Sequence, residues 1–329
     1  QKTPARAGRN KHIIPEELSR AVDNIQLRIG EAGNALMVLA GPEGGEYSRF
    51  LMSVVAGIRE AAPMQVATSD GSVENVLLID RGGARLGIVQ SDVAAAAVTG
   101  AGLFAGTGPL AHLRAAARLF PEPVHVVVRA NSGITSLPEL VGRRVALGAV
   151  SSGTRQTARR LLEVAGIDVR QLEDTEADSP QEALDRLIKG EIDAVIEVVS
   201  APWRQLENAM HTAPLVLVPL DLNVRVEVAT GALSLFPLTI AARTYPGQDE
   251  VVRTVAATAL LVARSDVAEA TVAATLELLY AAAADRGGVL AARLSRERAQ
   301  TGITIPLHEG ARRFFERPAA ALPSAAATN

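Results

Sequence analysis

Short apolar runs alternate with amphipathic segments along most of the chain. Apolar runs lie at 35–40, 64–68 and 85–89, and the segments at 44–60 and 72–80 between them have the pattern of helices. Regular alternation of strands with helices is typical of a sheet whose strands are mostly parallel. The sequence therefore predicts an α/β fold.

Two further apolar runs, at 115–119 and 124–128, are separated by Pro121, Glu122 and Pro123. Proline resists central strand positions because it cannot donate a backbone hydrogen bond. This break predicts that the chain crosses there from one lobe to another.

A second crossing is expected at the apolar run 215–220, which would return the chain to the first lobe. Two lobes with separate cores suit a chain of 329 residues. The predicted domains are an N-terminal arm and helix at 1–29, a first lobe made of 30–123 plus 222–316, a second lobe at 124–221 and a disordered tail at 317–329.

Helix starts are clearest in the second lobe. Ser136 and Ser179 each begin a capping box, and Ser-Ser-Gly-Thr at 151–154 precedes a segment whose apolar positions follow helical spacing. The other elements expected here and further along are strands at 143–148, 192–199, 238–242 and 256–263 and a helix at 266–284.

Composition excludes several classes of protein. The chain has no cysteine, so disulfides, thiolate nucleophiles and cysteine-ligated metals are excluded. A net charge of −3 and a pI near 6.0 give no reason to expect nucleic acid or an anionic membrane as a partner. No apolar run is long enough for a transmembrane helix.

Four junctions that follow predicted strands carry small or polar side chains; they lie at 44–48, 69–72, 90–92 and 151–154. The N-terminus of a helix exposes backbone N–H groups at the positive end of the helix dipole and so attracts carboxylates and phosphates. Ligands of open α/β sheets bind beyond the carboxyl ends of the strands. A cleft between two lobes is one interpretation of these junctions, and ordinary helix capping at each is the other.

Other chemistry finds little support in the sequence. The glycine-rich stretch 100–108 follows an alanine-rich segment instead of a strand, which is the wrong context for a dinucleotide loop. The five histidines form no HExxH motif and no i, i+4 pair, and there is no GxSxG elbow. We therefore expect no metal, no cofactor and no catalytic residue. Trp203 either lines a cleft or packs at the start of a helix.

Several segments taken together carry a family resemblance. They are GSVEN at 71–75, LGIVQSDVA at 86–94, FPEPVH at 120–125, SGT at 152–154, YPGQDE at 245–250 and IPLHEGA at 305–311. Their order and spacing over 34–316 resemble the TAXI subfamily of solute receptors, which serve tripartite ATP-independent periplasmic (TRAP) transporters.

The resemblance implies a type II periplasmic-binding-protein fold, in which two α/β lobes around a ligand cleft are joined by two crossovers. It also implies a receptor without enzyme activity that passes its solute to the membrane permease subunits of a TRAP transporter. Relatives of this kind include receptors for glutamate-like and other carboxylate solutes. The expected location is the periplasm, either free or anchored to a membrane through a segment outside this chain.

Two departures from the family pattern change the expected ligand. Residues 41–48 are Gly-Pro-Glu-Gly-Gly-Glu-Tyr-Ser, where the family usually has a loop rich in Gly and Thr that ends in Thr-Tyr-Tyr. Glu197 stands on a strand that is usually aromatic near its end. Glu43, Glu46 and Glu197 would repel a dicarboxylate. Either Arg49 or Arg155 neutralises them, or the ligand carries a cationic group as well as an anionic one, as an amino acid does; the second is our hypothesis.

The predicted function is capture of a small polar solute, an amino acid or a carboxylate, by lobe closure. The predicted ligand-binding residues are Gly45, Glu46, Tyr47, Ser48, Ser72, Gln90, Ser91, Asp92, Ser152, Gly153, Thr154, Arg155, Glu197 and Trp203. The alternative is a ligand-sensing domain of a membrane-anchored signalling protein with the same fold, and the sequence upstream of Gln1 would distinguish the two. An enzyme would need a nucleophile–base pair or a metal site, which the sequence lacks.

Overall fold

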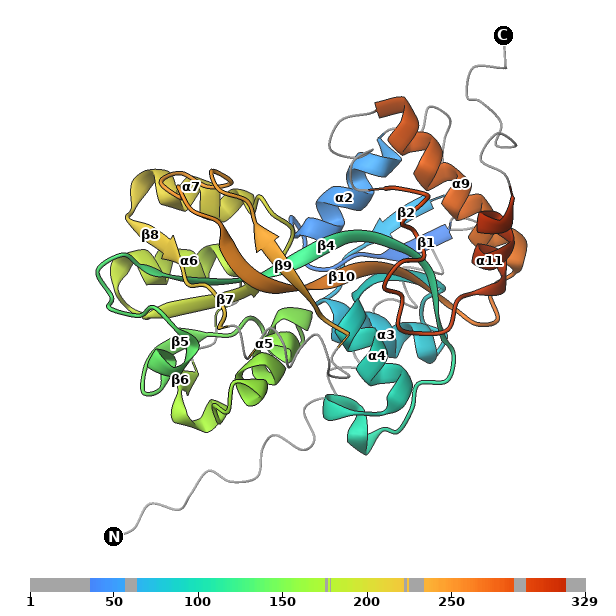
Figure 1. The fold of residues 1–329 in the computed structure, drawn as a ribbon. Helices are drawn as coiled ribbons and strands as arrows, with labels where there is room; N and C mark the ends of the chain where they lie inside the picture. Colours follow the sequence, from blue (N-terminus) through green and yellow to red (C-terminus); the bar gives the residue numbers. More distant parts are fainter. Residues whose placement is uncertain are drawn as a thin grey trace.

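The computed structural model describes residues 36–56, 64–174, 177, 179–221, 224, 234–286 and 294–317. Within these residues, two α/β lobes lie side by side and are joined by two long strands (Figure 1). The predicted N-terminal arm and helix at 1–29 and the predicted tail beyond 317 lie outside the described residues. No described helix is both long and apolar enough to cross a membrane.

The first lobe is built on parallel strands in the order β2-β1-β3, with β10 antiparallel to β3. Its strands are β1 (Leu36–Leu39), β2 (Met64–Ala67), β3 (Leu86–Gln90) and part of β10 (Val252–Arg264). Its helices are α2 (Glu46–Val55), α3 (Ser72–Asp80), α4 (Ser91–Thr99), α9 (Glu269–Arg286) and α11 (Glu309–Glu316). The predicted alternation of strands and helices in this part of the chain is confirmed.

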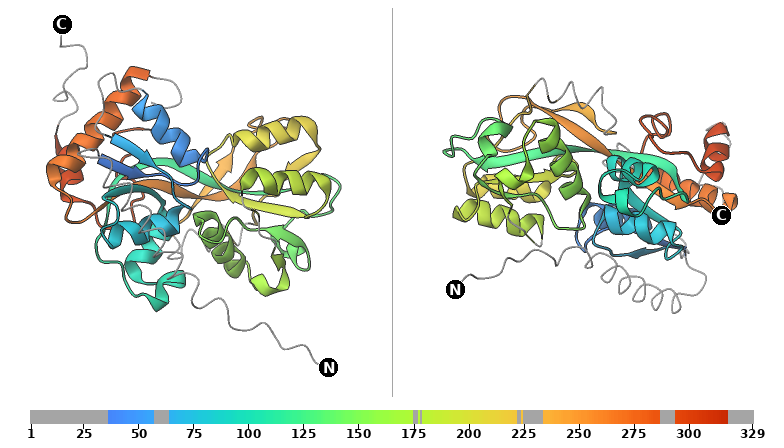
Figure 2. Two further views of the ribbon diagram at one scale, coloured as in Figure 1. Left: turned by 180° about the vertical axis from the view of Figure 1, so that it is seen from behind. Right: turned by 90° about the horizontal axis from the view of Figure 1, so that it is seen from below.

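Side chains of the first-lobe sheet divide between two cores. Val38 and Ile88 pack with α2, α9 and α11, whereas their neighbours Leu39 and Val89 pack with α3 and α4. Successive residues of a strand point to opposite faces of the sheet, so each short strand is apolar on both sides. Helices accordingly cover both faces of this sheet (Figure 2).

Strand β4 (Leu113–Arg129) passes through both lobes. It pairs with β10 as far as Pro123 and with β7 (Ala194–Val198) from Val124 onward. The break that the sequence predicts at 121–123 therefore does not interrupt the strand. The two prolines are accommodated because the register against β10 shifts between Arg118 and Pro121 and β4 changes its partner after Pro123.

The second lobe continues the sheet in the order β4-β7-β5-β6, with β8 paired to β4. One core lies against α5 and includes Val126 and Ile196, and the other lies against α6 and α7 and includes Val127 and Val195. The remaining elements are β5 (Arg144–Ala146), β6 (Glu173–Asp174), β8 (Leu215–Leu217), α5 (Gly153–Val164), α6 (Pro180–Lys189) and α7 (Arg204–Thr212).

Helix starts in the second lobe follow local signals in the sequence. The capping box predicted at Ser136 is confirmed, and it begins a short 3-10 helix at Leu137–Leu140. Ser152 caps α5 and Ser179 caps α6, each by accepting a backbone N–H from within the first turn. Gly190 ends α6 in the left-handed conformation that favours glycine. Local chemistry is therefore sufficient to place these helix ends.

The chain returns to the first lobe later than predicted. β8, within the run 215–220, pairs with β4 in the second lobe, and Ile240 of β9 (Phe236–Ile240) packs in a second-lobe core with Tyr245. Strand β10 contributes to the first-lobe cores only from Ala259 onward. Of the segment 222–316 that is assigned to the first lobe, several buried residues pack instead in second-lobe cores: Val224, Leu235, Ile240, Tyr245, Val252, Val255 and Ala257. An apolar run signals burial but does not indicate which of two cores receives it.

We expect Asn75→Ala to lower the free energy of unfolding by about 2–5 kcal/mol in urea denaturation, because two buried carbonyl groups lose their donor. Asn75 is fully buried in α3, and its amide nitrogen donates to the carbonyl oxygens of Ala40 at 2.6 Å and Ile88 at 2.8 Å. Thr99→Ala, at the exposed end of α4, is the control and should change stability by about 0.5 kcal/mol or less. Equal stability of the two variants would contradict this role of Asn75.

Candidate functional site

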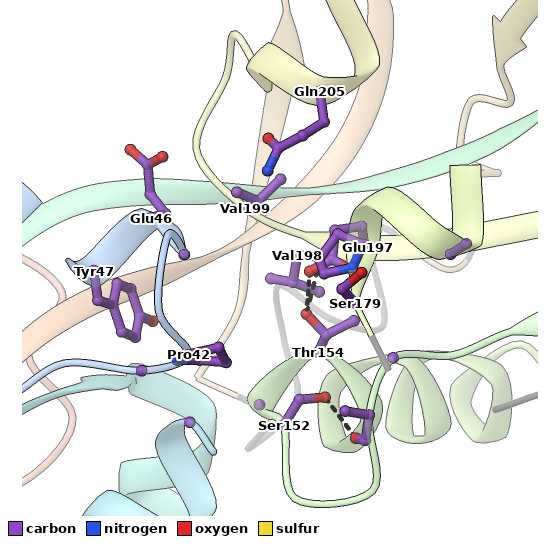
Figure 3. Close-up of a pocket in the computed structure, with 18 of the residues that line it drawn as sticks. Pro42, Glu46, Tyr47, Ser152, Thr154, Ser179, Glu197, Val198, Val199 and Gln205 are labelled. Carbon is purple, nitrogen blue, oxygen red and sulfur yellow. Dashed lines mark hydrogen bonds between the residues drawn. The ribbon is translucent and has the colours of Figure 1, made fainter. Parts of the chain in front are cut away.

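A cavity of about 310 Å³ lies between the two lobes. Its walls are the segments that follow β1, β2, β5, β6 and β7, together with Gln90 at the end of β3 and Glu122 of β4. The carboxyl ends of strands from both lobes therefore meet at one place, where open α/β sheets bind their ligands. Figure 3 shows Glu46 and Tyr47 of α2 on one side of the cavity and Thr154 and Glu197 of the second lobe on the other.

The lobes touch at the N-terminus of α5. A Cβ atom on Gly153 would lie 1.7 Å from Oε1 of Gln90 and 3.0 Å from Oγ of Ser72, both in the first lobe. Thr157, one turn further along α5, donates a hydrogen bond to Asp92 of α4 at 2.5 Å. A side chain at position 153 would therefore compete with the Gln90 and Ser72 side chains for the space between the lobes.

Two more contacts bridge the lobes at the rim of the cavity. The hydroxyl of Ser200, which follows β7, donates to Oε1 of Glu46 at 2.8 Å. The turn before α3 also approaches the turn before α5. Gly71 has a φ of 125°, and a Cβ atom placed on it would lie 3.5 Å from Cα of Ser152. The cavity is therefore bounded by direct contacts between the lobes on more than one side.

The hydroxyl of Thr154 holds the carboxyl of Glu197 in place. Thr154 donates to Oε1 of Glu197 at 2.8 Å and accepts the backbone N–H of Val198 at 3.3 Å. Burial raises the pKa of Glu197 to about 7, although the Thr154 hydroxyl and the backbone N–H of Val198 act on the carboxyl in the opposite direction. Glu197 therefore titrates near neutral pH.

Tyr47 and Glu122 form a buried hydrogen-bonded pair. The hydroxyl of Tyr47 donates to Oε2 of Glu122 at 2.8 Å. Burial raises the pKa of Glu122 well above its usual value, and the negative charges of Glu46, Asp92 and Glu197 raise it further. Burial and the neighbouring Glu122 also raise the pKa of Tyr47. Acidic groups from the first lobe, the second lobe and the joining strand thus repel one another around the cavity.

Trp203 lines the cavity and is held from behind by two aromatic side chains. Its ring meets the ring of His125 edge to face with 5.8 Å between centroids, and its backbone N–H donates to the hydroxyl of Tyr245 at 2.8 Å. Burial lowers the pKa of His125 to about 4, so the ring is neutral. Nδ1 of His125 donates to the carbonyl oxygen of Pro123 at 2.9 Å, and Nε2 accepts from Tyr245 at 2.7 Å. Trp203 also immediately precedes α7. It therefore both lines the cavity and packs at the start of a helix, the two roles that the sequence leaves open.

Most of the predicted site residues surround the cavity. Those that line it are Gly45, Glu46, Tyr47, Ser72, Gln90, Ser152, Gly153, Thr154, Glu197 and Trp203. The other predicted residues, Ser48, Ser91, Asp92 and Arg155, do not line it. The sequence places all of these residues at strand–helix junctions, but it does not indicate which side chains of a junction face inward.

The residues outside the lining have other contacts. Ser91 accepts the backbone N–H of Thr258 at 2.9 Å and so ties α4 to the joining strand β10. Arg155 turns toward Asp174 at the edge of the second lobe, with which it forms an ion pair. Ser48 is buried within α2, and Asp92 contacts the second lobe through Thr157. Asp92 and Ser91 therefore connect parts of the structure and lie outside the lining.

Glu122 is the most important cavity residue that the sequence analysis omits. It lies between two prolines that are interpreted only as a break between lobes, yet it is 2% exposed and lines the cavity. A lone acidic residue within an apolar stretch is the signal that could have identified it. Gln205 of α7 also lines the cavity, and nothing in its sequence context distinguishes it from other polar helix residues.

In the described part of the chain, no group of three or more His, Asp or Glu side chains could hold a metal ion. The glycine-rich stretch 100–108 forms a short 3-10 helix at Gly102–Gly106 and does not line the cavity. The chemistry available at this site is therefore that of carboxyl groups, hydroxyl groups, amides and aromatic rings.

We expect Glu197→Gln to reduce the dependence of stability on pH. A carboxyl with a pKa near 4.5 in the unfolded chain and about 7 in the folded protein takes up a proton on folding. Its contribution to stability is full below pH 4.5 and is lost as the pH rises through 7. Asp92, whose pKa is raised by burial to about 6, acts in the same direction and remains in the variant.

Urea denaturation of the protein at several pH values from about 5 to about 8 measures this effect. The unliganded wild type should lose stability over this range, and Glu197→Gln should lose less. Glu163→Gln, on the exposed side of α5, is the matched control and should follow the wild type. The same slope in Glu197→Gln and the wild type would show that this carboxyl is ionised in the folded protein.

The chain is similar to solved structures over most of its length. A periplasmic transporter is 13% identical, with a TM-score of 0.51 over 86% of this chain and 92% of that one. A protein from Bordetella bronchiseptica RB50 is 15% identical, with a TM-score of 0.52 over 80% and 76% of the two chains. The periplasmic aliphatic sulphonate binding protein of Escherichia coli is 17% identical, with a TM-score of 0.48 over 77% and 74%. The predicted type II periplasmic-binding-protein fold is confirmed.

The family assignment covers both lobes and the strands that join them. Residues 38–317 match the model of a family described as NMT1-like. This range includes nearly all the described residues and every wall of the cavity. This chain therefore belongs to the NMT1-like family.

Proposed function

We propose that this protein is a receptor that captures a small polar solute outside the cytoplasm by closing its two lobes. The observation that carries the proposal is the cavity of about 310 Å³, which takes its walls from both lobes. Cavities of this size suit small organic molecules. Because each lobe supplies only part of the wall, the complete site exists only when the lobes are together.

The way the lobes are joined supports closure. Strands β4 and β10 pass between the lobes, so small torsion changes near 121–124 and 257–259 would swing one lobe against the other. The contacts at the rim, from Gly153 to Gln90 and from Thr157 to Asp92, would then form on closing and separate on opening. A ligand that contacts both lobes would shift the population toward the closed form.

The polar groups of the cavity favour binding over catalysis. A catalytic hydroxyl nucleophile lies beside the base that activates it. The hydroxyl of Thr154 has such a neighbour, the carboxyl of Glu197, whose pKa is about 7. That hydroxyl is 5% exposed and also accepts the N–H of Val198. A hydroxyl engaged on both sides orients Glu197 and is poorly placed to attack a substrate.

The TAXI resemblance supports a role in transport. The segments that carry it contribute Ser72, Gln90, Glu122 and the SGT start of α5 to the cavity. Four of the six segments that carry the resemblance thus contribute residues to the cavity, whereas those at 245–250 and 305–311 contribute none. We assign the protein to the TAXI type, located in the periplasm, with the permease subunits of a TRAP transporter as the partner that receives the solute.

We expect Gly153→Val to prevent closure, because its Cβ would lie 1.7 Å from Oε1 of Gln90 in the other lobe. The variant should fold and should show a larger radius of gyration in small-angle X-ray scattering. It should also lose any solute that native mass spectrometry detects on the purified wild type.

Gly106→Ala is the control, since its Cβ would meet no other atom within 4 Å. It should keep both the scattering profile and the bound solute of the wild type. A compact Gly153→Val variant that retains the solute would contradict lobe closure. A wild type that carries no solute and binds none in a broad screen would contradict the receptor function itself.

A further inference from the structure

The cavity has many more acidic than basic side chains. The acidic side chains that line it are Glu43, Glu46, Asp70, Glu122 and Glu197, and among the described lining residues Arg49 alone is basic. Arg49 is 39% exposed and pairs with Glu46 at 3.0 Å. This pair lies near the surface, so it leaves Glu122 and Glu197 without a neutralising cation.

Glu122 approaches the cavity from the joining strand. Tyr47 donates to its Oε2 atom, and the described residues supply no donor to Oε1. Prolines on both sides hold the backbone, and the side chain is buried among other acids. A ligand that brings a positively charged donor to Oε1 would satisfy this atom and would also favour the ionised form of the carboxyl.

Glu197 approaches from the second lobe. Thr154 donates to its Oε1 atom, and in the part of the chain that is described no side chain donates to Oε2. Figure 3 shows this carboxyl beside Thr154, across the cavity from Tyr47, the partner of Glu122. Two carboxyl groups, each with a single side-chain donor among the described residues, thus belong to one small cavity.

Gln90 provides an independent sign of a missing donor. Its side chain is 3% exposed and lines the cavity, and its Oε1 atom is buried with no hydrogen-bond partner among the described residues. A buried acceptor without a donor is costly. A ligand that brings an N–H group to the start of α5 would satisfy this oxygen.

The remaining walls suit an organic cation. Tyr47 and Trp203 present aromatic rings, and Val198 and Val199 are apolar. Aromatic faces attract cations, and apolar walls strengthen the attraction between a cation and a carboxylate by excluding water. An anionic ligand would instead face the repulsion of the buried acids.

We propose that the solute carries a protonated amine or a guanidinium group, which is bound between Glu122 of the joining strand and Glu197 of the second lobe. The inference rests on the proposed receptor function and names the chemical class of its ligand. Because Glu122 moves with the joining strand and Glu197 with the second lobe, the cation would also link these two parts as the lobes close.

Four probes of similar length and different charge test the proposal: putrescine, γ-aminobutyrate, 1,4-butanediol and succinate. Thermal shift and titration calorimetry measure their binding to the full chain. Putrescine or γ-aminobutyrate should bind more tightly than 1,4-butanediol, and succinate should bind most weakly. The first two carry ammonium groups, and the last two carry none.

Glu122→Gln and Glu197→Gln keep the shape of each side chain and remove its charge. Each should weaken binding of the ammonium probe about ten- to a hundredfold and leave binding of 1,4-butanediol unchanged. Glu163→Gln removes a carboxyl from the exposed face of α5 and should change neither. A loss of binding that is equal for charged and neutral probes would indicate a structural role for the carboxyls and would overturn the proposal.

The outcomes separate this proposal from the receptor function. If succinate or 1,4-butanediol binds at least as tightly as the ammonium probes, the cation inference is wrong and solute capture stands. A co-purified solute without a basic nitrogen would also contradict the cation inference and leave solute capture standing. A co-purified solute with a basic nitrogen would support the inference. If no probe binds and no solute co-purifies, both proposals fail.

Discussion

The antiparallel pairing of β4 with β10 is the constraint on which the rest of the structure depends. Because β4 passes between the lobes and changes partner between Pro123 and Val124, the joint between the lobes and the wall of the cavity share the same residues. Glu122, opposite Ala257 in this pairing, is carried by the joint itself. Any rotation of one lobe against the other therefore changes the position of Glu122 relative to the side chains around it.

The energetics of the rim are consistent with reversible closure. The lobes meet through the backbone at Gly153 and through single hydrogen bonds such as those of Thr157 and Ser200. An intramolecular hydrogen bond contributes about 1 kcal/mol net, and the mutual repulsion of the buried carboxyls opposes closure. The free energies that favour and oppose closure are therefore both small. A ligand that contacts both lobes can then decide whether the open or the closed form predominates.

Much of the architecture can be predicted from local pattern, and the errors have a common cause. Helix α3 begins and ends at the residues that the sequence predicts, Ser72 and Asp80. The chain does pass between the lobes at Pro121–Pro123, but as one continuous strand, because the prolines lie beside a change of partner where the missing donors are tolerated. The apolar run 215–220 was expected to cross between lobes, but two cores compete for any such run and only the complete fold assigns it.

The sequence by itself determined the α/β fold class, the strand–helix junctions where polar residues gather, and the absence of cysteine chemistry. These properties depend on residue type and on spacing within a single element. The tertiary structure alone decided that Ser91 and Asp92 connect elements and lie outside the lining, and that Glu122 joins Glu197 at one cavity. Glu122 and Glu197 are far apart in the chain, and only the pairing of β4 with both β10 and β7 brings them together.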